Sequence, residues 1–328
     1  MNDEDLATGH PDRTARSDAK RFSAASAPVI AVQGLTCAGR TGARLRDVSL
    51  TVHEGEWLAV FGPTACGKTS LLQALSGDLA PTSGEVMALG APPSLAAARI
   101  HFVPEEPVAP GRVCVRDALL TRLGRRGHVP PAQRAARVAE GLEAVGIAEL
   151  RDVPVRDLTH GQRLAMMLAA AIADDPALLL LDNATAALPE PVAARVFAYL
   201  DGRRAADGLT VVHATCSSHE AERADRVAIL HGGQILVCEP PGQIIRRLAA
   251  DRIIIEADNP EEVLRTARGV FDVEVEEDAR QLRFSARDPV EMAAQVMRHP
   301  AGGASVVHVR YGTLWDAYAR LLAQTNRT

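Results

Sequence analysis

The segment GPTACGKTS, residues 62–70, has the spacing G-x-x-x-x-G-K-[ST] of a loop that binds phosphate. In such a loop, backbone N–H groups at the start of a helix hold the oxygens of the β-phosphate. Lys68 would reach the β- and γ-phosphates, and the hydroxyl of Thr69 would ligate Mg²⁺. The residues that we predict to bind the nucleotide phosphates are Gly62, Pro63, Thr64, Ala65, Cys66, Gly67, Lys68, Thr69 and Ser70.

The sequence around this loop strengthens the prediction. Of the 36 basic residues only Lys20 and Lys68 are lysines, so we expect the site at Lys68 to reject arginine. The loop follows a strand-like run and opens a helix-like one, which makes a chance glycine-rich turn the weaker interpretation. Cys66 lies among N–H donors beside Lys68, and this environment favours the thiolate. We therefore expect rapid alkylation of Cys66, suppressed by Mg-ATP.

A second motif, LLLLDNATAALP at residues 178–189, is a hydrophobic run that ends in an aspartate. A buried strand of this kind delivers one carboxylate to its C-terminal end, where Asp182 would hold Mg²⁺. In isolation, an aspartate at a strand end is more often a cap or turn residue, but the phosphate-binding loop favours the metal-binding role. The next residue is Asn183, whose amide cannot accept a proton at neutral pH.

The elements that must position these residues alternate along the chain from Val29 to about Ala250. Short apolar runs are separated by amphipathic or Ala/Leu-rich stretches, which predicts a mostly parallel sheet with helices on both faces. Residues 106–160 lack strand-like runs and are predicted to form an inserted helical lobe. Residues 1–27 are polar and predicted to be a disordered tail. The runs predicted to be strands are WLAVFG, RIHFV, ALLLLD, LTVVHAT and RVAIL.

The composition restricts the partners and the compartment. The net charge is −5 and no long basic block occurs, which argues against nucleic acid as the main partner. The five cysteines have no CxxC or CxxH spacing, as expected for reduced thiols in the cytosol. No apolar stretch approaches the roughly 18 residues of a membrane span, so we expect a soluble protein.

A third motif, DLTHGQRLAMMLAAAIADDP at 157–176, completes a resemblance to the ATPase subunits of ABC transporters over about residues 28–250. In that family this segment reads LSGGQ before a helix. A hydroxyl and a glycine N–H at a helix N-terminus form an anion site, although an ordinary helix cap is the alternative interpretation. The resemblance implies a P-loop NTPase domain of the ABC ATPase type that uses ATP and Mg²⁺. It also implies that the segment grips the γ-phosphate bound to the opposite subunit, here through Leu158, Thr159, His160, Gly161 and Gln162.

The resemblance breaks at the positions that carry the chemistry. It places the family's catalytic glutamate on Asn183 and its switch histidine on Cys216, and a thiol is the poorer donor to phosphate. His213 and His219 lie nearby out of register and are interpreted as core or surface histidines. The family's glutamine that joins Mg²⁺ to the helical lobe falls on Glu105, whose carboxylate would either ligate Mg²⁺ or repel the γ-phosphate.

Three further departures concern nucleotide affinity and the partner. Pro189 replaces an aspartate of the loop after the second motif and lacks a backbone N–H. No aromatic residue lies near Gly39 to stack on adenine. Ala65 replaces a glycine, and would add about 1–2 kcal/mol of strain if its backbone is left-handed. Together the six departures predict a pseudo-ATPase that binds nucleotide with reduced affinity and hydrolyses it weakly.

A second unit is predicted for residues 251–328, after an ATP-binding domain at 28–250. Its strand-like runs are RIIIEAD, VFDVEVEE, QLRFSA and SVVHVRY, and its helix-like segments are 260–268, 288–299 and 313–324. The order βαββαβ with a final helix matches a small α+β, ferredoxin-like accessory domain. The whole fold is therefore predicted to be α/β with a helical subdomain and this accessory domain.

The C-terminal segment HVRYGTLWDAYARLLA, at 308–323, is similar to the end of ATP-binding subunits of the daunorubicin-resistance type. An amphipathic helix that packs on the sheet is the simpler interpretation. The similarity implies an exporter of drugs or metabolites whose membrane subunit is a separate polypeptide. The residues that carry the similarity are Thr313, Leu314, Asp316 and Tyr318, whereas Trp315 and Ala317 depart from it.

Three functions remain open from the sequence. The first is the ATP-binding subunit of such an exporter, held at the inner face of the cell membrane by its permease and paired with a second ATP-binding subunit. The second is a slow but active ATPase homodimer in which Glu105 or Asp182 positions the water. The third is a cytosolic ATP-binding regulatory module without a membrane partner.

Overall fold

The computed structural model describes residues 27–39, 42–106, 111–249, 251–257, 275–278, 281–286 and 304–325. The chain divides into one compact unit from Met1 to Pro240 and a second from Pro241 to Thr328. This division precedes the boundary that we predicted at 250/251. The difference arises because helix α8, Pro241–Leu248, packs on the last helix, α11, Leu314–Thr325.

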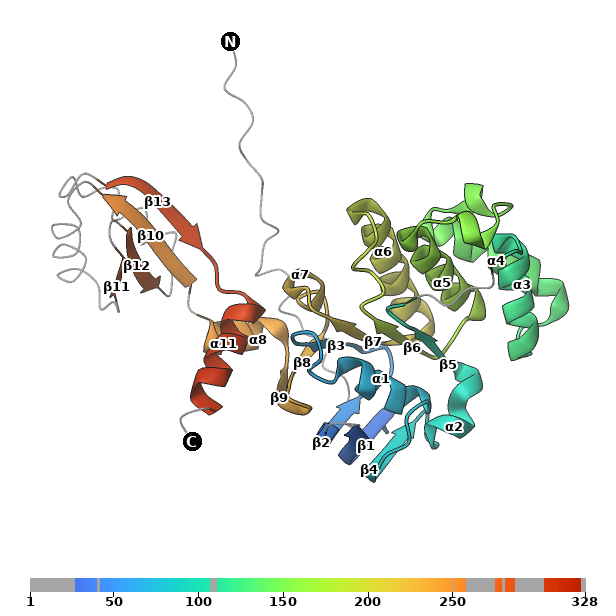
Figure 1. The fold of residues 1–328 in the computed structure, drawn as a ribbon, viewed down its shortest axis with the longest axis horizontal. Helices are drawn as coiled ribbons and strands as arrows, with labels where there is room; N and C mark the ends of the chain where they lie inside the picture. The colour runs from blue at the N-terminus through green and yellow to red at the C-terminus, as the bar shows by residue number, and fades with distance from the viewer. Residues whose placement is uncertain are drawn as a thin grey trace, which may run out of the picture. The chain divides into compact units, whose positions relative to one another are not determined.

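A six-stranded sheet is the centre of the first unit (Figure 1). Its five parallel strands are mostly apolar, and every residue of β3, β6 and β7 is buried, because helices cover both faces. The predicted parallel strands are thus confirmed, and an antiparallel strand, β9, is added at the edge. In spatial order the strands are β5 (Ile100–Val103), β6 (Leu178–Asp182), β7 (Thr210–Thr215), β3 (Trp57–Phe61), β8 (Arg226–His231) and β9 (Gln234–Glu239).

A second, three-stranded antiparallel sheet was not predicted. It consists of β2 (Gly42–Val52), β1 (Ile30–Gly39) and β4 (Ser83–Ala88), in that order. Helix α1, Lys68–Ser76, lies between this sheet and the six-stranded one (Figure 1). Aliphatic side chains from both sheets and from α1 form one buried core, which fixes the start of α1 under the ends of the parallel strands.

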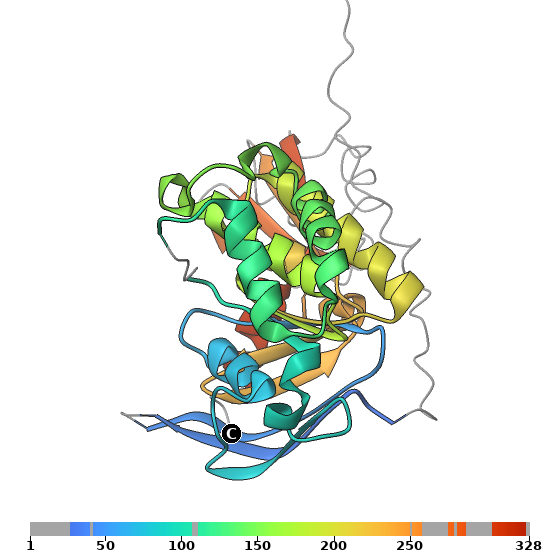
Figure 2. The same cartoon turned by 90° about the vertical axis from the view of Figure 1, so that its right-hand side faces the viewer.

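The other face of the six-stranded sheet is covered by α5, His160–Asp174, and α6, Glu190–Asp207. Trp57 of β3 packs on Phe197 of α6, with ring centroids 5.6 Å apart. The predicted helical lobe is confirmed by α3, Val115–Arg126, and α4, Pro131–Val145 (Figure 2). Short helical segments complete the unit: α2 (Pro93–Ala96), α7 (Ser218–Ala221) and 3₁₀ turns at Ala97–Arg99, Ala148–Leu150 and Val155–Asp157.

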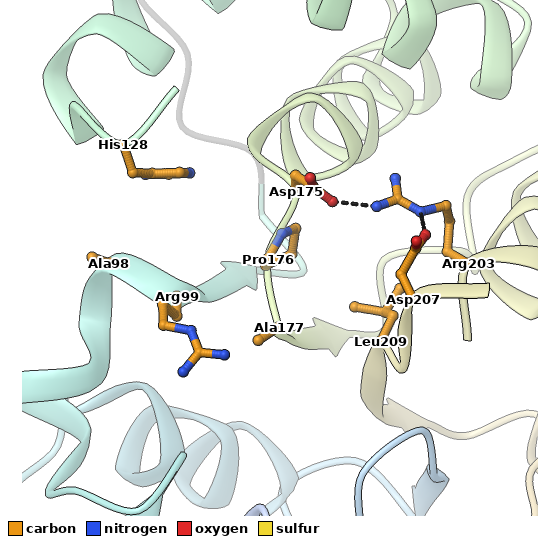
Figure 3. A pocket seen from close by; sticks show the side chains of 9 residues that line it. All are labelled: Ala98, Arg99, His128, Asp175, Pro176, Ala177, Arg203, Asp207 and Leu209. Carbon is orange, nitrogen blue, oxygen red and sulfur yellow. Dashed lines mark hydrogen bonds and ion pairs between the residues drawn. The ribbon is translucent and has the colours of Figure 1, made fainter. Parts of the chain in front are cut away.

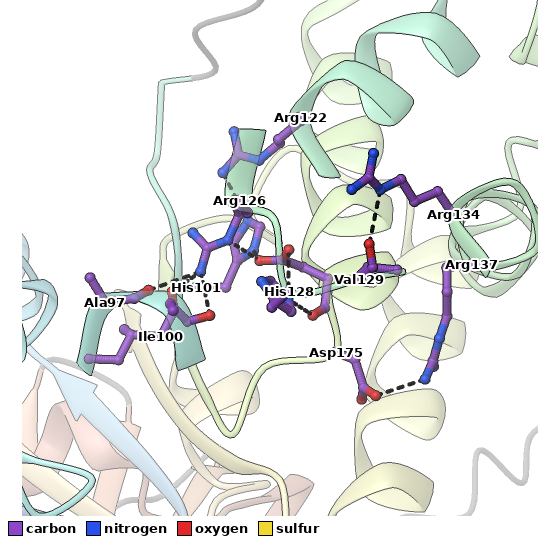
Figure 4. A network of polar contacts seen from close by, with 12 residues as sticks. Ala97, Ile100, His101, Arg122, Arg126, His128, Val129, Arg134, Arg137 and Asp175 are labelled. Carbon is purple, nitrogen blue, oxygen red and sulfur yellow. Dashed lines mark hydrogen bonds and ion pairs between the residues drawn. The ribbon is translucent and has the colours of Figure 1, made fainter. Parts of the chain in front are cut away.

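A buried polar network joins α3 to the six-stranded sheet (Figure 4). Asp174, the last residue of α5, lies 2.6 Å from Nε of Arg126 and accepts a hydrogen bond from Nδ1 of His101 at 2.7 Å. Arg122 lies 3.0 Å from the other nitrogen of the His101 ring. Arg126 also donates to the carbonyl oxygen of Ile100 at 2.7 Å. The lobe is therefore attached to β5, the strand that leads to Glu105.

The second unit contains a four-stranded antiparallel sheet in the order β11, β12, β10, β13. This is the strand order expected of the split βαβ unit, and the final helix, predicted for 313–324, begins at Leu314. The helices predicted at 260–268 and 288–299 lie outside the described residues, as does the predicted tail up to residue 26. The strands are β10 (Asp251–Ala257), β11 (Val275–Asp278), β12 (Gln281–Ala286) and β13 (Ala304–Arg310).

In the described parts of the chain, no helix combines the length and the apolar character that crossing a membrane requires.

Candidate functional site

The loop between β3 and α1 folds around the side chain of Lys68. Its ammonium donates hydrogen bonds to the carbonyl oxygens of Gly62 and Pro63, at 2.8 Å each, and to Sγ of Cys216 at 3.3 Å. Only 8% of Lys68 is exposed, and a buried ammonium needs such partners. Phosphate oxygens entering the loop would offer the same ammonium stronger, charged acceptors.

Two glycines of the loop leave no room for a side chain. A Cβ on Gly62 would lie 2.3 Å from the carbonyl oxygen of Leu230. A Cβ on Gly67, whose φ is 115°, would lie 2.8 Å from the carbonyl oxygen of Arg44. Ala65 has a φ of 63°, so the left-handed backbone that we considered from the sequence is present, with its strain of about 1–2 kcal/mol.

A pocket of about 290 Å³ opens beside this loop, at the C-terminal ends of β5, β6 and β7. Parallel strands deliver their C-terminal residues to one edge of the sheet, which is the usual ligand site in such folds. Arg44 of β2 is the one lining residue that the sequence did not predict, because nothing in its surroundings marks it. The pocket is lined by Arg44, Thr64, Ala65, Gly67, Lys68, Thr69, Ser70, Glu105, Asp182, Asn183 and Cys216.

The oxygen groups of this pocket suit a hard cation. Asp182 is only 2% exposed. Burial raises the pKa of its carboxyl group and the charge of Glu105 adds to this, whereas the hydrogen bond from Thr69 and the charge of Lys68 oppose it. A hydroxyl and one or two carboxylates are the protein ligands that Mg²⁺ uses beside nucleotide phosphates. Thr69 and Asp182 therefore fit the predicted Mg²⁺ site chemically, whereas Glu105, the third predicted ligand, lies against the amide of Asn183.

Glu105 and Asn183 are in direct contact. Nδ2 of Asn183 donates a hydrogen bond to Oε1 of Glu105 at 2.7 Å. The backbone N–H of Asn183 donates to the carbonyl oxygen of Ala214 at 2.8 Å, and its φ is 49°. Asparagine is one of the few residues other than glycine that adopt this left-handed conformation readily. The amide is thus held in a fixed place against the carboxylate.

The loop with Cys216 is fixed by a buried network around Glu220. Its two carboxylate oxygens accept hydrogen bonds from Thr185 at 2.7 Å and from Thr215 at 2.5 Å. Thr185 also lies 3.3 Å from Nε2 of His213, which is fully buried and whose pKa is lowered by burial. His213 is a core histidine, as predicted, and Glu220 couples the loop after β6 to the loop after β7.

The signature residues lie at the N-terminus of α5 and do not line the pocket. Thr159 caps the helix, accepting from the N–H of Gln162 at 3.3 Å, while the side chain of Gln162 accepts from the N–H of Thr159 at 2.9 Å. The helix cap, which was the alternative interpretation of this segment, is therefore present, and the anion site stays a prediction. Gly161 packs against the loop after β6, where a Cβ would lie 2.7 Å from the carbonyl oxygen of Ala187.

The remaining signature residues and Pro189 lie near this helix end. Leu158 is buried and His160 is exposed. Pro189 is the N-cap of α6, and its missing N–H leaves no donor at that position. His219, the second histidine near the switch position, is an exposed residue of α7.

The prediction of a thiolate at Cys66 is wrong. The residue is only 5% exposed, and burial raises the pKa of its thiol more strongly than the nearby charge of Lys68 lowers it. The sequence revealed the lysine and the N–H donors but not the packing of the side chain against the loop. Rapid alkylation of Cys66 is therefore no longer expected.

A second cavity, of about 320 Å³, lies at the opposite ends of β5, β6 and β7 (Figure 3). Arg203 forms ion pairs there with both Asp175 and Asp207, so its charge is already engaged within the chain. The N-terminal ends of the strands are not the usual ligand site of such a sheet. Its lining residues are Ala98, Arg99, His128, Asp175, Pro176, Ala177, Arg203, Asp207 and Leu209.

The chain is similar to known ATP-binding proteins. The sequence profile described as "ABC transporter" matches residues 45–186. The cobalt import ATP-binding protein CbiO of Rhodobacter capsulatus is 34% identical over 223 residues, covering 64% of this chain and 78% of the relative. The Nod factor export ATP-binding protein I of Neorhizobium galegae is 29% identical over 274 residues, covering 81% and 78%.

Solved structures show the same fold. A dimeric ATP-binding cassette in a post-hydrolysis state, bound to ADP and Pi, has a TM-score of 0.61 at 22% identity and covers 64% of this chain and 98% of that chain. The predicted P-loop fold of the ABC ATPase type is confirmed. The chain is 34% identical to a relative of which it covers 78%. With the matching profile, this identity shows that the chain belongs to the ATP-binding subunits of ABC transporters.

Proposed function

We propose that this chain binds Mg-ATP in the pocket beside Lys68 and couples nucleotide binding to a separate permease that exports a drug or metabolite. The observation that carries the proposal is the convergence of Lys68, Thr69 and Asp182 on one pocket of about 290 Å³. An ammonium that contacts the phosphates, with a hydroxyl and a carboxylate that hold Mg²⁺, is the set of groups that binds a nucleoside triphosphate with its Mg²⁺.

For the direction of transport we propose export, because the relative named for Nod factor export aligns with 81% of this chain. The relatives named for methionine import and cobalt import align with 73% and 64%. The C-terminal segment adds the similarity to exporter subunits described above, and two of the residues that carry it, Thr313 and Asp316, form a hydrogen-bonded cap at the start of α11. Asp316 accepts from the hydroxyl of Thr313 at 2.7 Å and from its N–H at 2.9 Å.

A second ATP-binding subunit completes the site in this proposal. The signature residues lie at the N-terminus of α5, outside the pocket of their own chain, where a partner's γ-phosphate would meet the helix end. Either a second copy or a different ATP-binding subunit would serve. The chain would then be cytoplasmic and peripheral, held at the inner face of the cell membrane by its permease.

Hydrolysis is proposed to be slow. Asn183 occupies the position where the family keeps a glutamate, and loss of such a base typically costs roughly 10²–10⁴ in rate. Nucleotide binding is proposed to be weakened separately, by the strained backbone of Ala65 and by the lack of an aromatic residue near Gly39.

The test measures nucleotide binding and hydrolysis by the purified full chain and by its Lys68→Ala and Lys68→Arg variants. We expect Mg-ATP to bind the wild type and not the two variants. The turnover of the wild type should be far below that of an ordinary ATPase. Turnover at an ordinary rate that Lys68→Ala abolishes would contradict slow hydrolysis. Absence of binding to the wild type would contradict the nucleotide site itself.

The role at the membrane needs its own experiment. In cells that express the chain together with its permease, we expect it to sediment with the membrane fraction. A chain that stays in the supernatant with and without ATP would favour the regulatory module instead.

A further inference from the structure

The contact between Asn183 and Glu105 distinguishes this pocket from the family pattern. The two residues follow β6 and β5, which are neighbouring parallel strands, and their side chains meet at 2.7 Å. The family resemblance leads one to expect a glutamine at 105 and a glutamate at 183. One amide and one carboxylate are still present, but they have exchanged places.

Two carboxylates line the pocket, and they differ in what they can still accept. Asp182 is buried, so little of its carboxylate is open to a water molecule. Glu105 is exposed, and within the described residues its only hydrogen bond is the one from the amide of Asn183. A carboxylate offers about four acceptor sites, so Glu105 retains sites for a water molecule.

The amide of Asn183 has the geometry of a fixed support. Its backbone is held by the hydrogen bond to Ala214 and by a left-handed φ of 49°, which asparagine adopts at little cost. The amide therefore reaches Glu105 from a rigid position at the end of β6. A donor in this place fixes the orientation of the carboxylate it binds.

We infer that Glu105 orients the water that attacks the γ-phosphate, and that Asn183 positions Glu105 for this role. The inference rests on the nucleotide binding proposed above. In the reaction the water oxygen forms a bond to the γ-phosphorus, and the bond from this phosphorus to the bridging oxygen breaks, which leaves ADP and phosphate. The proton lost by the water passes to a Glu105 oxygen and from there to the released phosphate.

The substitution Asn183→Glu distinguishes this arrangement from a site that has simply lost its catalytic glutamate, because it should restore turnover only in the second case. Asn183→Glu alone places a second carboxylate within hydrogen-bond distance of the first, and like charges this close repel. It therefore does not restore turnover. The double variant Glu105→Gln/Asn183→Glu returns both groups to the family arrangement, and we expect it to be more active than Asn183→Glu.

The experiment measures Mg-ATP binding, KM and kcat for the full chain and for Glu105→Gln, Asn183→Gly and Glu106→Gln. Glu105→Gln is expected to lower kcat about 100-fold while the chain still binds Mg-ATP. Asn183→Gly removes the amide but suits the left-handed backbone, so kcat should fall about tenfold with KM unchanged. Glu106, the exposed neighbour outside the pocket, is the control and should leave both constants as in the wild type.

The results that overturn the inference differ from those that overturn the proposed function. Glu105→Gln that turns over ATP like the wild type refutes the role of Glu105, and so does a wild type that binds ATP without any turnover. A kcat of Asn183→Glu higher than that of the double variant refutes the inferred exchange of the amide and the carboxylate between positions 105 and 183. A wild type that binds no nucleotide refutes the proposed function instead.

Discussion

Ala65 holds its backbone at a φ of 63° in the loop before Lys68, a conformation in which glycine bears no steric cost. We predict that Ala65→Gly raises the free energy of unfolding by about 1 kcal/mol, because relief of strain exceeds the added freedom of the unfolded chain. Urea unfolding of the wild type and of Ala65→Gly measures this difference in the free energy of unfolding. Ala136→Gly on the exposed surface of α4 is the matched control and should lower the same quantity by about 1 kcal/mol. Equal losses in both would show that Ala65 is unstrained.

Arg44 lines the pocket where the sequence offers no aromatic platform for the base. A guanidinium can stack on a planar ring, and at an exposed site such a contact contributes about 0.5–1 kcal/mol. We therefore predict that Arg44→Ala weakens ATP binding about two- to fivefold but leaves the binding of inorganic triphosphate nearly unchanged. Arg46→Ala, exposed on the same strand and outside the pocket, is the control. A parallel loss for ATP and triphosphate would show that Arg44 contacts phosphate instead.

Residues of the site could be predicted where a local pattern carries the chemistry. Lys68 and Asp182 stand in motifs with fixed spacing, and the structure brings both to one pocket. Arg44 could not be found, because only the packing of the second sheet brings β2 to the nucleotide loop. The state of Cys66 also depends on packing, since burial outweighs the neighbouring charge.

At the scale of elements, strongly apolar runs such as those of β3 and β6 gave reliable predictions, because buried parallel strands read as nearly continuous hydrophobic segments. The three-stranded sheet was missed. Its strand β1 alternates between buried and partly exposed residues with register shifts against both neighbours, which interrupts the period-2 signal.

The network between α3, α5 and β5 gives the fold a dependence on pH. Burial, aided by Arg122 and Arg126 and opposed by Asp174, lowers the pKa of His101 from 6.5 to about 4. Below pH 6.5 the unfolded chain therefore binds a proton that the folded chain does not take up until about pH 4. This group favours folding fully above pH 6.5, and its contribution falls by at most about 3 kcal/mol as the pH drops to 4. His128, on the lobe side, faces the same carboxylate at 3.2 Å.

Urea unfolding at pH 7, 6 and 5 measures this dependence. His101→Gln should give a smaller loss of stability between pH 7 and 5 than the wild type, whatever its stability at pH 7. The buried His213 contributes in the same direction and remains in both proteins, so the slope decreases without vanishing. His219→Gln, at an exposed site, is the control. An unchanged slope for His101→Gln would show that His101 is not the group responsible.

At the scale of the whole molecule, the proposed function makes the pocket and the signature helix parts of two different composite sites. The pocket lies at the C-terminal ends of the parallel strands, whereas the signature residues begin α5 and already satisfy their own cap. In an isolated chain the phosphate-binding loop therefore has the N-terminus of α1 beside it but not that of α5. In the dimer proposed above, a second subunit would supply the N-terminus of its α5.

His160 tests this arrangement because it is exposed at the first position of α5. His160→Glu places a negative charge at a helix N-terminus, which should stabilise the folded chain by about 0.3–1 kcal/mol. The same charge would face the γ-phosphate of the opposite subunit and should weaken ATP-dependent dimerisation about tenfold, measured by analytical ultracentrifugation with and without Mg-ATP. His219→Glu, exposed on α7, should leave dimerisation as in the wild type. A His160→Glu chain that dimerises normally with ATP would show that this helix end does not meet a partner's nucleotide. A chain that is less stable would show instead that the residue has a structural role in its own subunit.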